Sequence, residues 1–338
     1  MYSFLRPLFF RLSPEQAHAL SLKMIRLAGA VPPVRAILQA WFAGPQRTVQ
    51  AFGLSFPNPV GLAAGYDKDA LAWRGLAALG FGHIEVGTVT SLPQPGNPAP
   101  RLFRLIPEQA LINRMGFPSQ GAALIARRLQ PDRPRGVVLG VNLGKNKDTP
   151  LEAAAQDYLG LLKTFAPLAD YLAINVSSPN TVGLRRLQGR VALEELLGQL
   201  DRARQIQASR LGRPVPLLVK LAPDLSVAEL DDALEALLHT GMDGVIATNT
   251  TLSREGLHSS LSGEAGGLSG APLRQRSTQM VRQIVRRTGD KLPVIGVGGV
   301  LDAASAREKL DAGAILVQVY TGLVYAGPGV VKAILRGL

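Results

Sequence analysis

Residues 175–181, with the sequence Asn-Val-Ser-Ser-Pro-Asn-Thr, directly follow the apolar run 171–174. A buried strand that ends in small polar residues and a proline holds amide and hydroxyl groups rigidly at the rim of a sheet. Amides can hold a ligand by hydrogen bonds, and a serine hydroxyl can act as a base once its surroundings activate it. One such segment is equally typical of an ordinary turn, so the prediction of a site depends on similar strand ends elsewhere.

Almost all of the remaining short apolar runs of the chain are also followed by polar residues. The endings are Ala63-Ala64-Gly65-Tyr66-Asp67-Lys68, Gly87-Thr88-Val89-Thr90, Asn142-Leu143-Gly144-Lys145-Asn146, Lys220, Thr248-Asn249-Thr250-Thr251, Gly296-Val297-Gly298-Gly299 and Tyr320-Thr321-Gly322. They are rich in amides, hydroxyls, lysine and glycine, and carboxylates are almost absent. This composition predicts a planar, anionic, hydrogen-bonding ligand and argues against a metal site or a catalytic pair of carboxylates.

Two of these endings predict a phosphate site. Gly298-Gly299 and Thr321-Gly322 follow the last two apolar runs, and glycine lets backbone N–H groups approach a phosphate closely. A Gly-Gly pair alone is more often a plain turn, so the prediction rests on both positions together.

Lys68 and Lys220 also follow buried runs. At such a position a lysine either meets a negative charge on a ligand or extends its ammonium group to the surface.

From about residue 54, short apolar runs alternate with amphipathic segments of helical period. The predicted strands are 60–63, 83–87, 137–142, 171–176, 217–221, 244–247, 293–297 and 315–320. The predicted helices include 70–79, 152–166, 227–239, 273–287 and 303–312. About eight βα units in this length are typical of a closed (β/α)8 barrel, an α/β fold that gathers the C-terminal ends of its strands around one site. A doubly wound open sheet is the alternative, although it normally has fewer strands and one dominant glycine-rich turn.

Residues 1–44 differ from this pattern and predict a small helical extension. Ser13-Pro14-Glu15-Gln16 has the capping residues of a helix start, and Gly29 is a residue that can end this helix. A second short helix is predicted at about 34–42. The segment is rich in large apolar side chains, namely Tyr2, Phe4, Leu5, Leu8, Phe9, Phe10, Ile37, Leu38, Trp41 and Phe42. They either pack on the barrel or form an apolar mouth that rests on a membrane.

The composition excludes several classes of protein. The 338 residues include no cysteine, which excludes disulfides and thiolate chemistry. They include four histidines, which do not have the spacing of metal ligands, so we expect no metal site. The net charge is +12, but the arginines are scattered and no aromatic-interleaved basic tract occurs, so no nucleic-acid partner is predicted. The uncharged run 312–331 contains glycines, Pro328 and polar residues, and it predicts a strand, a turn and a helix start rather than a membrane span.

Residues 113–117, with the sequence Asn-Arg-Met-Gly-Phe, lie in a long connection after the second predicted strand. Long connections of this kind are usually either functional or disordered. The asparagine and glycine offer a polar clamp and the phenylalanine a hydrophobic wall. We therefore expect this segment to form part of the site.

The chain resembles the quinone-dependent, membrane-associated (class 2) dihydroorotate dehydrogenases over essentially its whole length, including the N-terminal helices. The resemblance is carried by AAGYDK at 63–68, GTVT at 87–90, NRMGF at 113–117, GVNLGKN at 140–146, NVSSPNT at 175–181, TNTT at 248–251, GGLSG at 266–270, GVGG at 296–299 and QVYTG at 318–322. It implies an FMN-dependent oxidoreductase that converts (S)-dihydroorotate to orotate in UMP synthesis and passes electrons to a membrane quinone. It also implies that residues 1–44 are a helical membrane and quinone-access segment and that residues 45–338 are the FMN-binding barrel.

The resemblance assigns residues to each ligand. FMN would be bound by Ala63, Ala64, Gly65, Tyr66, Asp67, Thr88, Asn142, Asn175, Lys220, Thr248, Gly270, Gly299, Tyr320 and Thr321. Dihydroorotate would be bound by Lys68, Asn113, Arg114, Met115, Gly116, Phe117, Asn175, Asn180, Asn249 and Thr250. His18, Arg104 and Tyr320 match positions along the quinone tunnel of the family.

Ser178 matches the catalytic base of the family, which takes a proton from C5 while a hydride leaves C6. The residues themselves do not favour Ser178 over Ser177. Serine is a poor base at its ordinary pKa, and no histidine lies nearby in the sequence, so we expect a relay through Thr181 or water. Lys220 would stabilise negative charge on the flavin ring, and Lys68 would bind the anionic substrate.

The resemblance also implies a peripheral membrane protein, on the cytoplasmic face of the inner membrane if the source is bacterial, and we expect a monomer. Three other assignments compete with this one. Cytosolic relatives that use fumarate or NAD typically have a cysteine base and lack the N-terminal helices. A tRNA dihydrouridine synthase would fit the charge of +12 but needs a catalytic cysteine and an RNA-binding appendage. A phosphate-binding barrel without catalysis would show no flavin spectrum bleached by dihydroorotate.

Overall fold

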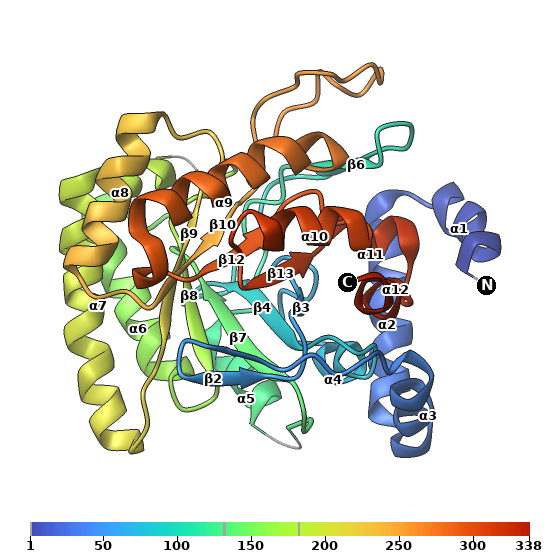
Figure 1. Cartoon of the computed structure of the whole chain (residues 1–338), viewed down its shortest axis with the longest axis horizontal. Helices are drawn as coiled ribbons and strands as arrows, with labels where there is room; N and C mark the ends of the chain where they lie inside the picture. The colour runs from blue at the N-terminus through green and yellow to red at the C-terminus, as the bar shows by residue number, and fades with distance from the viewer. Residues whose placement is uncertain (1, 131–132, 182) are drawn as a thin grey trace.

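A computed structural model describes residues 2–130, 133–181 and 183–338 of the chain, and eight parallel strands close a barrel at its centre (Figure 1). The barrel strands are β3 (Val60–Leu62), β4 (His83–Val89), β7 (Val138–Leu143), β8 (Tyr171–Asn175), β9 (Leu217–Leu221), β10 (Gly244–Ala247), β12 (Val294–Val297) and β13 (Leu316–Val319). They follow one another around the barrel in chain order, and β13 pairs with β3 with Val317 opposite Val60. The predicted (β/α)8 barrel is confirmed, and the open-sheet alternative is wrong.

Each predicted strand overlaps an observed one, and the predictions at 217–221 and 244–247 match from end to end. Every residue of the eight strands is buried. This burial explains the continuous apolar runs in the sequence, because side chains fill the barrel on one face and helices cover the other.

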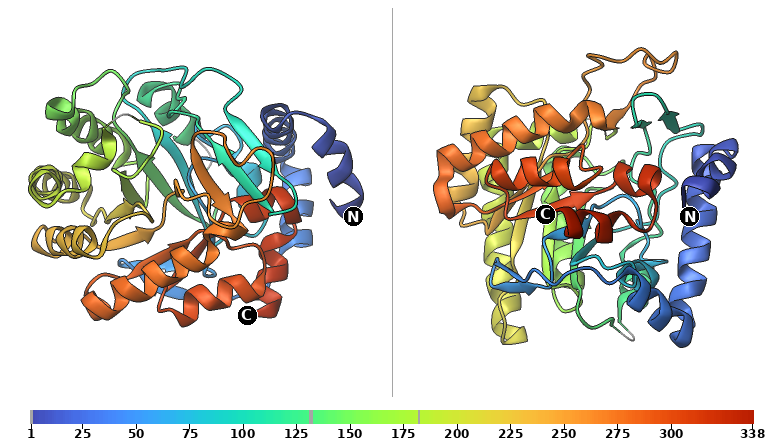
Figure 2. Two further views of the ribbon diagram at one scale, coloured as in Figure 1. Left: turned by 90° about the horizontal axis from the view of Figure 1, so that it is seen from above. Right: turned by 45° about the vertical axis from the view of Figure 1, so that its right-hand side comes forward.

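Helices surround the barrel, as the view from above shows (Figure 2). They are α4 (Trp73–Ala77), α5 (Ala122–Leu129), α6 (Ala154–Phe165), α7 (Arg190–Leu211), α8 (Val227–His239), α9 (Arg274–Thr288), α10 (Ala303–Asp311), α11 (Thr321–Ala326) and α12 (Val330–Gly337), with 3-10 turns at Leu151–Ala153, Leu184–Gln188, Ala271–Leu273 and Gly289–Lys291. The helix predicted at 70–79 is shorter in the structure. The reason is a turn before it, in which Ala70 has a φ of 52° and Asp67 accepts hydrogen bonds from the backbone N–H groups at 71 and 72.

Two small sheets extend the barrel, and the sequence patterns predicted neither. β1 (Val49–Ala51) and β2 (Leu54–Phe56) form an antiparallel hairpin. β5 (Leu102–Leu105), β6 (Ala110–Asn113) and β11 (Gly267–Gly270) form a three-stranded sheet. In this sheet Asn113 pairs with Gly267 from a distant connection, so strand pairing orders the start of the segment 113–117.

Three helices precede the barrel and lie along one side of it (Figures 1 and 2). They are α1 (Tyr2–Arg11), α2 (Pro14–Ala30) and α3 (Pro32–Phe42). The predicted capping box is confirmed, because Ser13 Oγ accepts the N–H of Gln16 at 3.3 Å and Gln16 Oε1 accepts the N–H of Ser13 at 3.2 Å. The prediction that Gly29 ends the helix is wrong. Gly29 lies where α2 meets α4, and a Cβ there would be 2.4 Å from the backbone nitrogen of Gly75, so close packing requires glycine.

The uncharged run 312–331 forms β13, α11 and the start of α12, as the strand-and-helix prediction expected. In the described part of the chain, no helix combines the length and the apolar character needed to cross a membrane.

His83 is a fully buried histidine at the start of β4, with its ring 5.4 Å from the ring of Phe56 in the β1–β2 hairpin. Among the described residues, neither ring nitrogen has a hydrogen-bond partner. Burial lowers the pKa of His83 to about 3. The ring is therefore neutral in the folded protein down to strongly acidic pH.

We expect acid to destabilise the protein through His83. Between pH 6.5 and about 3 the unfolded chain holds a proton on this histidine that the folded protein does not, so the free energy of unfolding falls as the pH falls. The loss should be about 2 kcal/mol between about pH 7 and pH 5. Urea unfolding of the wild type and of His83→Leu measures it, because the variant should lack this loss. His239→Leu, at an exposed position, is the control, and equal pH dependence in all three proteins would contradict the prediction.

Candidate active site

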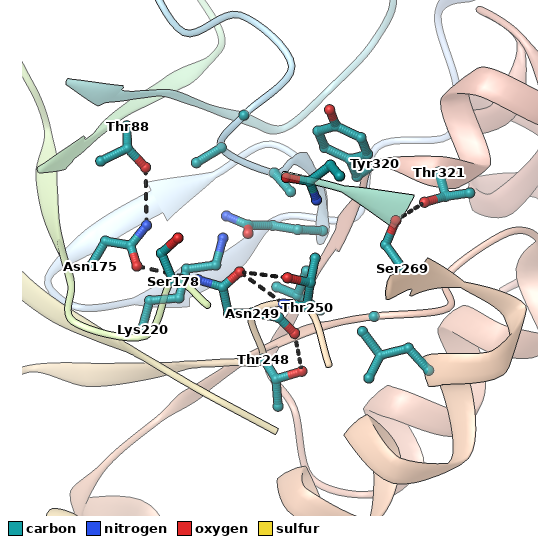
Figure 3. Close-up of a pocket in the computed structure, with 18 of the residues that line it drawn as sticks. Thr88, Asn175, Ser178, Lys220, Thr248, Asn249, Thr250, Ser269, Tyr320 and Thr321 are labelled. Atoms are coloured by element: carbon teal, nitrogen blue, oxygen red, sulfur yellow. Dashed lines mark hydrogen bonds between the residues drawn. The ribbon is translucent and has the colours of Figure 1, made fainter. Parts of the chain in front are cut away.

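A cavity opens at the C-terminal ends of the barrel strands, with about 910 Å³ of empty space when the solvent at its mouth is included (Figure 3). Most of the residues predicted for the site line it, namely Ala63, Ala64, Gly65, Lys68, Thr88, Asn113, Met115, Gly116, Phe117, Asn175, Ser178, Asn180, Lys220, Thr248, Asn249, Thr250, Gly270, Gly299, Tyr320 and Thr321. The predicted phosphate turn adds Gly298, and the structure further adds Ser269, Leu273, Val297, Val300 and Gln318. Of these, Val297 belongs to the ending at 296–299 that the sequence analysis singled out. Ser269 and Gln318 lie inside the motifs GGLSG and QVYTG, which was the only sequence signal for them.

Four of the residues predicted to bind FMN or the substrate lie outside this wall. Tyr66 lines a neighbouring cavity instead, and the Asp67 carboxylate caps the turn before α4. Asn142 is fully buried behind the wall. Arg114 forms an ion pair of 2.6 Å with Glu264, which ties the segment 113–117 to the connection that leads to β11. These four positions support the site without facing the cavity.

An amide and hydroxyl network joins the ends of β4, β7, β8 and β10. Asn175 Nδ2 donates to Thr88 Oγ1 at 3.0 Å and to Asn142 Oδ1 at 3.1 Å. Asn175 Oδ1 accepts from the N–H of Ser177 and from Asn249 Nδ2, both at 3.3 Å. Because each amide is oriented by its neighbours, the cavity presents donors and acceptors in set directions.

The structure separates the two adjacent serines that the sequence could not distinguish. Ser178 lines the cavity, and its Oγ accepts the N–H of Asn180 at 3.2 Å. Ser177 is fully buried, and its Oγ bonds to Asn175 Oδ1 at 3.3 Å and Asn249 Nδ2 at 3.0 Å. Ser178 therefore has the hydroxyl that a ligand can reach, whereas the expected relay through Thr181 stays a prediction.

Arg185 connects the two loops that carry the serines and the threonines. Its Nε donates to the carbonyl of Ser177 at 3.2 Å, and its Nη2 donates to the carbonyl of Thr250 at 3.1 Å. An ion pair of 3.0 Å with Asp224 orients the guanidinium. Sequence reasoning missed this role, since Arg185 is one of many scattered arginines and its partners are far apart in the chain.

Two lysines face the cavity rather than the outer surface of the protein. Lys68 Nζ donates to the carbonyl of Gly65 at 2.6 Å. Burial lowers the pKa of Lys68 to about 8, although the charge of Asp69 opposes this shift. Lys220 Nζ lies 3.9 Å from Glu85 Oε1, and burial lowers its pKa against the opposing effect of that carboxylate. Each ammonium group is a candidate partner for negative charge on a ligand.

Glycines and hydroxyls meet at the other end of the cavity. Figure 3 shows Ser269 and Thr321 there, across from Thr88 and Asn175, and their hydroxyl oxygens are 2.9 Å apart. Three cavity glycines have left-handed backbone conformations, with φ values of 98° at 270, 115° at 298 and 71° at 299. A long ligand with a planar end near Lys220 and a phosphate near these turns fits this arrangement.

Gln318 is a second feature of this cavity that fits a bound ligand. The residue is 1% exposed and lines the cavity, and its Oε1 has no hydrogen-bond partner within the described residues. A buried acceptor without a partner is costly. A ligand N–H would satisfy it.

A second cavity, of about 1340 Å³, lies between the N-terminal helices and the barrel. Most of its wall is apolar and comes from α1, α2 and the region of α11, and it contains all three predicted tunnel residues, His18, Arg104 and Tyr320. Arg104 Nη1 donates to the carbonyl of Phe10 at 3.2 Å, and its guanidinium lies 4.2 Å from the centroid of the Phe10 ring. The N-terminal helices therefore enclose space as well as covering the barrel.

Aromatic rings connect the two cavities. Tyr320 lines both of them, its ring centroid lies 6.0 Å from that of Tyr66, and Tyr66 lies 4.9 Å from His18. Burial, with the charge of Lys68 adding to it, lowers the pKa of His18 to about 4. The histidine is therefore neutral near pH 7 and can sit beside an apolar ligand.

Comparison with known proteins agrees with this geometry. The sequence model of the dihydroorotate dehydrogenase family matches residues 47–338. The chain belongs to this family. The dihydroorotate dehydrogenase (quinone) of Roseiflexus sp. (strain RS-1) is 51% identical over 344 residues, which cover 100% of this chain and 93% of that protein. The protein of the same name from Acidithiobacillus ferrooxidans is 53% identical and covers 100% of this chain and 94% of its own length.

Solved structures agree with the family assignment. The structure of the Eimeria tenella enzyme in complex with ferulenol superimposes with a TM-score of 0.86 at 37% identity, covering 96% of this chain and 90% of that one. The resemblance drawn from the motifs is confirmed, and the assignment to tRNA dihydrouridine synthases is wrong. The names of the relatives also favour the quinone-dependent class over relatives that use fumarate or NAD.

Proposed function

We propose that this protein oxidises (S)-dihydroorotate to orotate in UMP synthesis, with FMN as hydride acceptor and a membrane quinone as final acceptor. The observation that carries the proposal is that a cavity walled by amides, hydroxyls and lysines meets an apolar cavity at Tyr320. A water-soluble substrate and a lipid-soluble quinone need separate entrances to one cofactor, and these two cavities would provide them.

The first cavity fits FMN. The glycine turns and hydroxyls would bind its phosphate, and the amides and Lys220 would bind the polar edge of its ring. The wall residues proposed for FMN are Ala63, Ala64, Gly65, Thr88, Asn175, Lys220, Thr248, Gly270, Gly299, Tyr320 and Thr321. Tyr66, Asp67 and Asn142 would act from behind the wall, by holding the strand ends in place. When bound, FMN supplies the acceptor for the substrate hydride.

The proposed substrate site lies beside Lys68, whose ammonium group would bind the substrate carboxylate. Asn180 Nδ2 donates to the carbonyl and to Oδ1 of Asn113, at 3.0 and 3.1 Å, so the loop after β8 and the segment 113–117 are joined. Asn175, Asn249 and Thr250 would bind the polar ring. Met115, Gly116 and Phe117 would cover it, while Arg114 holds that segment in place.

Ser178 would act as the base of the reaction. Its Oγ would take the proton from C5 of dihydroorotate, a hydride would leave C6, and the C5–C6 double bond of orotate would form. The N–H of Asn180 already points at Ser178 Oγ, and a donor in this position stabilises the negative charge that develops on the oxygen. Thr181 or water would carry the proton away.

Residues 1–44 would receive the quinone and hold the protein on a bilayer. Their helices expose large apolar side chains, among them Phe4, Leu8, Leu27, Ile37 and Trp41 with exposed fractions of 86, 61, 59, 65 and 63%. Such a surface favours peripheral attachment, here to the cytoplasmic face of the cell membrane. His18, Arg104 and Tyr320 would then line the path of the quinone head, in a protein that acts as a monomer.

The test is anaerobic mixing of the purified yellow protein with dihydroorotate, followed by addition of a quinone. Bleaching of the flavin absorbance by dihydroorotate and its return with quinone are the expected results. A protein that lacks flavin, or whose flavin is not bleached, would contradict the proposal.

Lys68→Ala should weaken orotate binding while sparing FMN content. The lost charge-assisted contact is worth about 1.5–3 kcal/mol, or roughly 10- to 150-fold in the dissociation constant. Titration of orotate into the oxidised protein measures it. Lys147→Ala removes an exposed lysine and is the matched control.

The pH dependence of orotate binding offers a second check on Lys68. Only the protonated lysine attracts the carboxylate, and the pKa of Lys68 is about 8 in the free protein, so affinity should fall as the pH rises above that value. Lys68→Ala should lose this dependence. Wild-type affinity in the variant at neutral pH would exclude Lys68 as a substrate ligand.

A further inference from the structure

Glu85 is a fully buried carboxylate inside β4, next to the floor of the first cavity. Its Oε1 accepts from Asn142 Nδ2 at 2.8 Å, and its Oε2 accepts from Gln318 Nε2 at 2.9 Å and Tyr171 Oη at 3.1 Å. Lys220 Nζ lies 3.9 Å from Oε1. Donors from β7, β8 and β13 and a cation from β9 thus converge on one acidic side chain.

Three hydrogen-bond donors surround the carboxylate of Glu85. The amide nitrogens of Asn142 and Gln318 can only donate, and one of them points at each carboxylate oxygen. Burial and the neighbouring carboxylate raise the pKa of Tyr171 well above 10, so its hydroxyl also donates. An ionised carboxylate accepts from all three donors at once, and it balances the charge of the buried Lys220.

Glu85 also sets the direction of the amide network. Because Asn142 Nδ2 donates to Glu85, Asn142 Oδ1 is left to accept from Thr88 Oγ1 at 2.5 Å and Asn175 Nδ2 at 3.1 Å. Asn175 Oδ1 must then accept from Asn249 Nδ2. Glu85 stands at one end of this series of hydrogen bonds and can only accept them. It therefore determines the direction in which the donor and acceptor atoms of each amide in the series point.

Lys220 is the charged residue of this group that reaches the cavity. It lines the cavity, whereas Glu85 lies behind it. We propose that Glu85 is a positioning residue that holds Lys220 and the amides in orientation and, by balancing the Lys220 charge, lowers the midpoint potential of the bound flavin. The inference rests on the proposed function, because it needs FMN beside Lys220. A flavin ring gains negative charge when it is reduced. The positive charge of Lys220 stabilises this reduced form, whereas the negative charge of Glu85 destabilises it.

The test is the midpoint potential of the FMN-loaded protein, measured by equilibration with a reference dye. Glu85→Gln keeps the shape but removes the charge, so Lys220 is left uncompensated. The ratio of reduced to oxidised flavin at a fixed potential should rise roughly tenfold, which is about +30 mV for a two-electron couple. Lys220→Gln should shift the potential in the opposite direction, and the double variant should lie near the wild type.

Controls separate this role from a structural one. Glu235→Gln removes the same charge from an exposed ion pair with Arg190 on the outer helices and should leave the potential unchanged. A purely structural role of Glu85 would lower FMN content and thermal stability without raising the potential. An unchanged or lower potential in Glu85→Gln overturns the inference.

The double variant also decides the case in which Glu85→Gln alone fails to retain FMN. An FMN content of Glu85→Gln/Lys220→Gln that equals that of Lys220→Gln alone supports the charge balance, whereas a lower content overturns it. Wild-type flavin that dihydroorotate does not bleach would instead refute the proposed function, so the two failures are distinguishable.

Discussion

Replacement of Ser178 by alanine is expected to slow flavin reduction by dihydroorotate roughly 10²–10⁴-fold, the usual contribution of a general base. Ser178 Oγ is in the cavity wall beside the proposed substrate residues, and its hydrogen-bond donor is the backbone N–H of Asn180. The removed hydroxyl lies on the substrate side of the site, so FMN content should stay normal. Stopped-flow absorbance under anaerobic conditions measures the rate.

Two further serine variants sharpen this test. Ser178→Cys places a more acidic group at the same position, since a thiol has a pKa of about 8.5, and it should be faster than the alanine variant. Ser209→Ala removes an exposed serine of α7 and should match the wild type. Near-normal flavin reduction in Ser178→Ala would show that another group is the base.

Deletion of residues 1–44 should separate the two half-reactions. The truncated protein should still be reduced by dihydroorotate, but it should lose vesicle binding and efficient oxidation by long-chain quinones. The reason is the loss of one wall of the second cavity and of the exposed apolar surface of α1–α3. Burial of apolar surface is worth about 25 cal/mol per Å², and each Lys or Arg near an anionic bilayer adds about 1 kcal/mol.

The truncation needs a check of folding, because the helices also cover the barrel. Gly29 meets Gly75, and Tyr2 Oη donates to the carbonyl of Val324 at 2.6 Å. FMN content reports whether the barrel survives. Ile37→Ser and Trp41→Ser alter only exposed positions of α3 and should weaken vesicle binding with the cavity intact. A folded truncation that binds vesicles and oxidises long-chain quinones at the full rate would refute the role of residues 1–44.

The sequence by itself determined the barrel and the chemical character of its site. Strands buried on both faces appear in the sequence as continuous apolar runs. Closure of the barrel brings the C-terminal ends of these strands together. The residues at those ends, among them Lys68, Asn175, Lys220 and Thr248, were therefore predicted to be neighbours. The motifs identified the family for the same reason. A binding site restricts the residue types at the strand ends, and the residues of each strand end stay contiguous in the chain.

Only the tertiary structure decided which side chains face the cavity. Ser177 and Ser178 are identical in type and adjacent, and they differ only in where the turn after β8 points them. Glu85 escaped detection because it lies inside β4, where its partners come from β7, β8, β9 and β13. Gly29 was predicted to end a helix, yet it is required by a contact with Gly75. For Glu85 and Gly29, and for Ser177 through its hydrogen bond from Asn249 Nδ2, the deciding interaction joins residues distant in the chain. Local sequence patterns contain no record of such contacts.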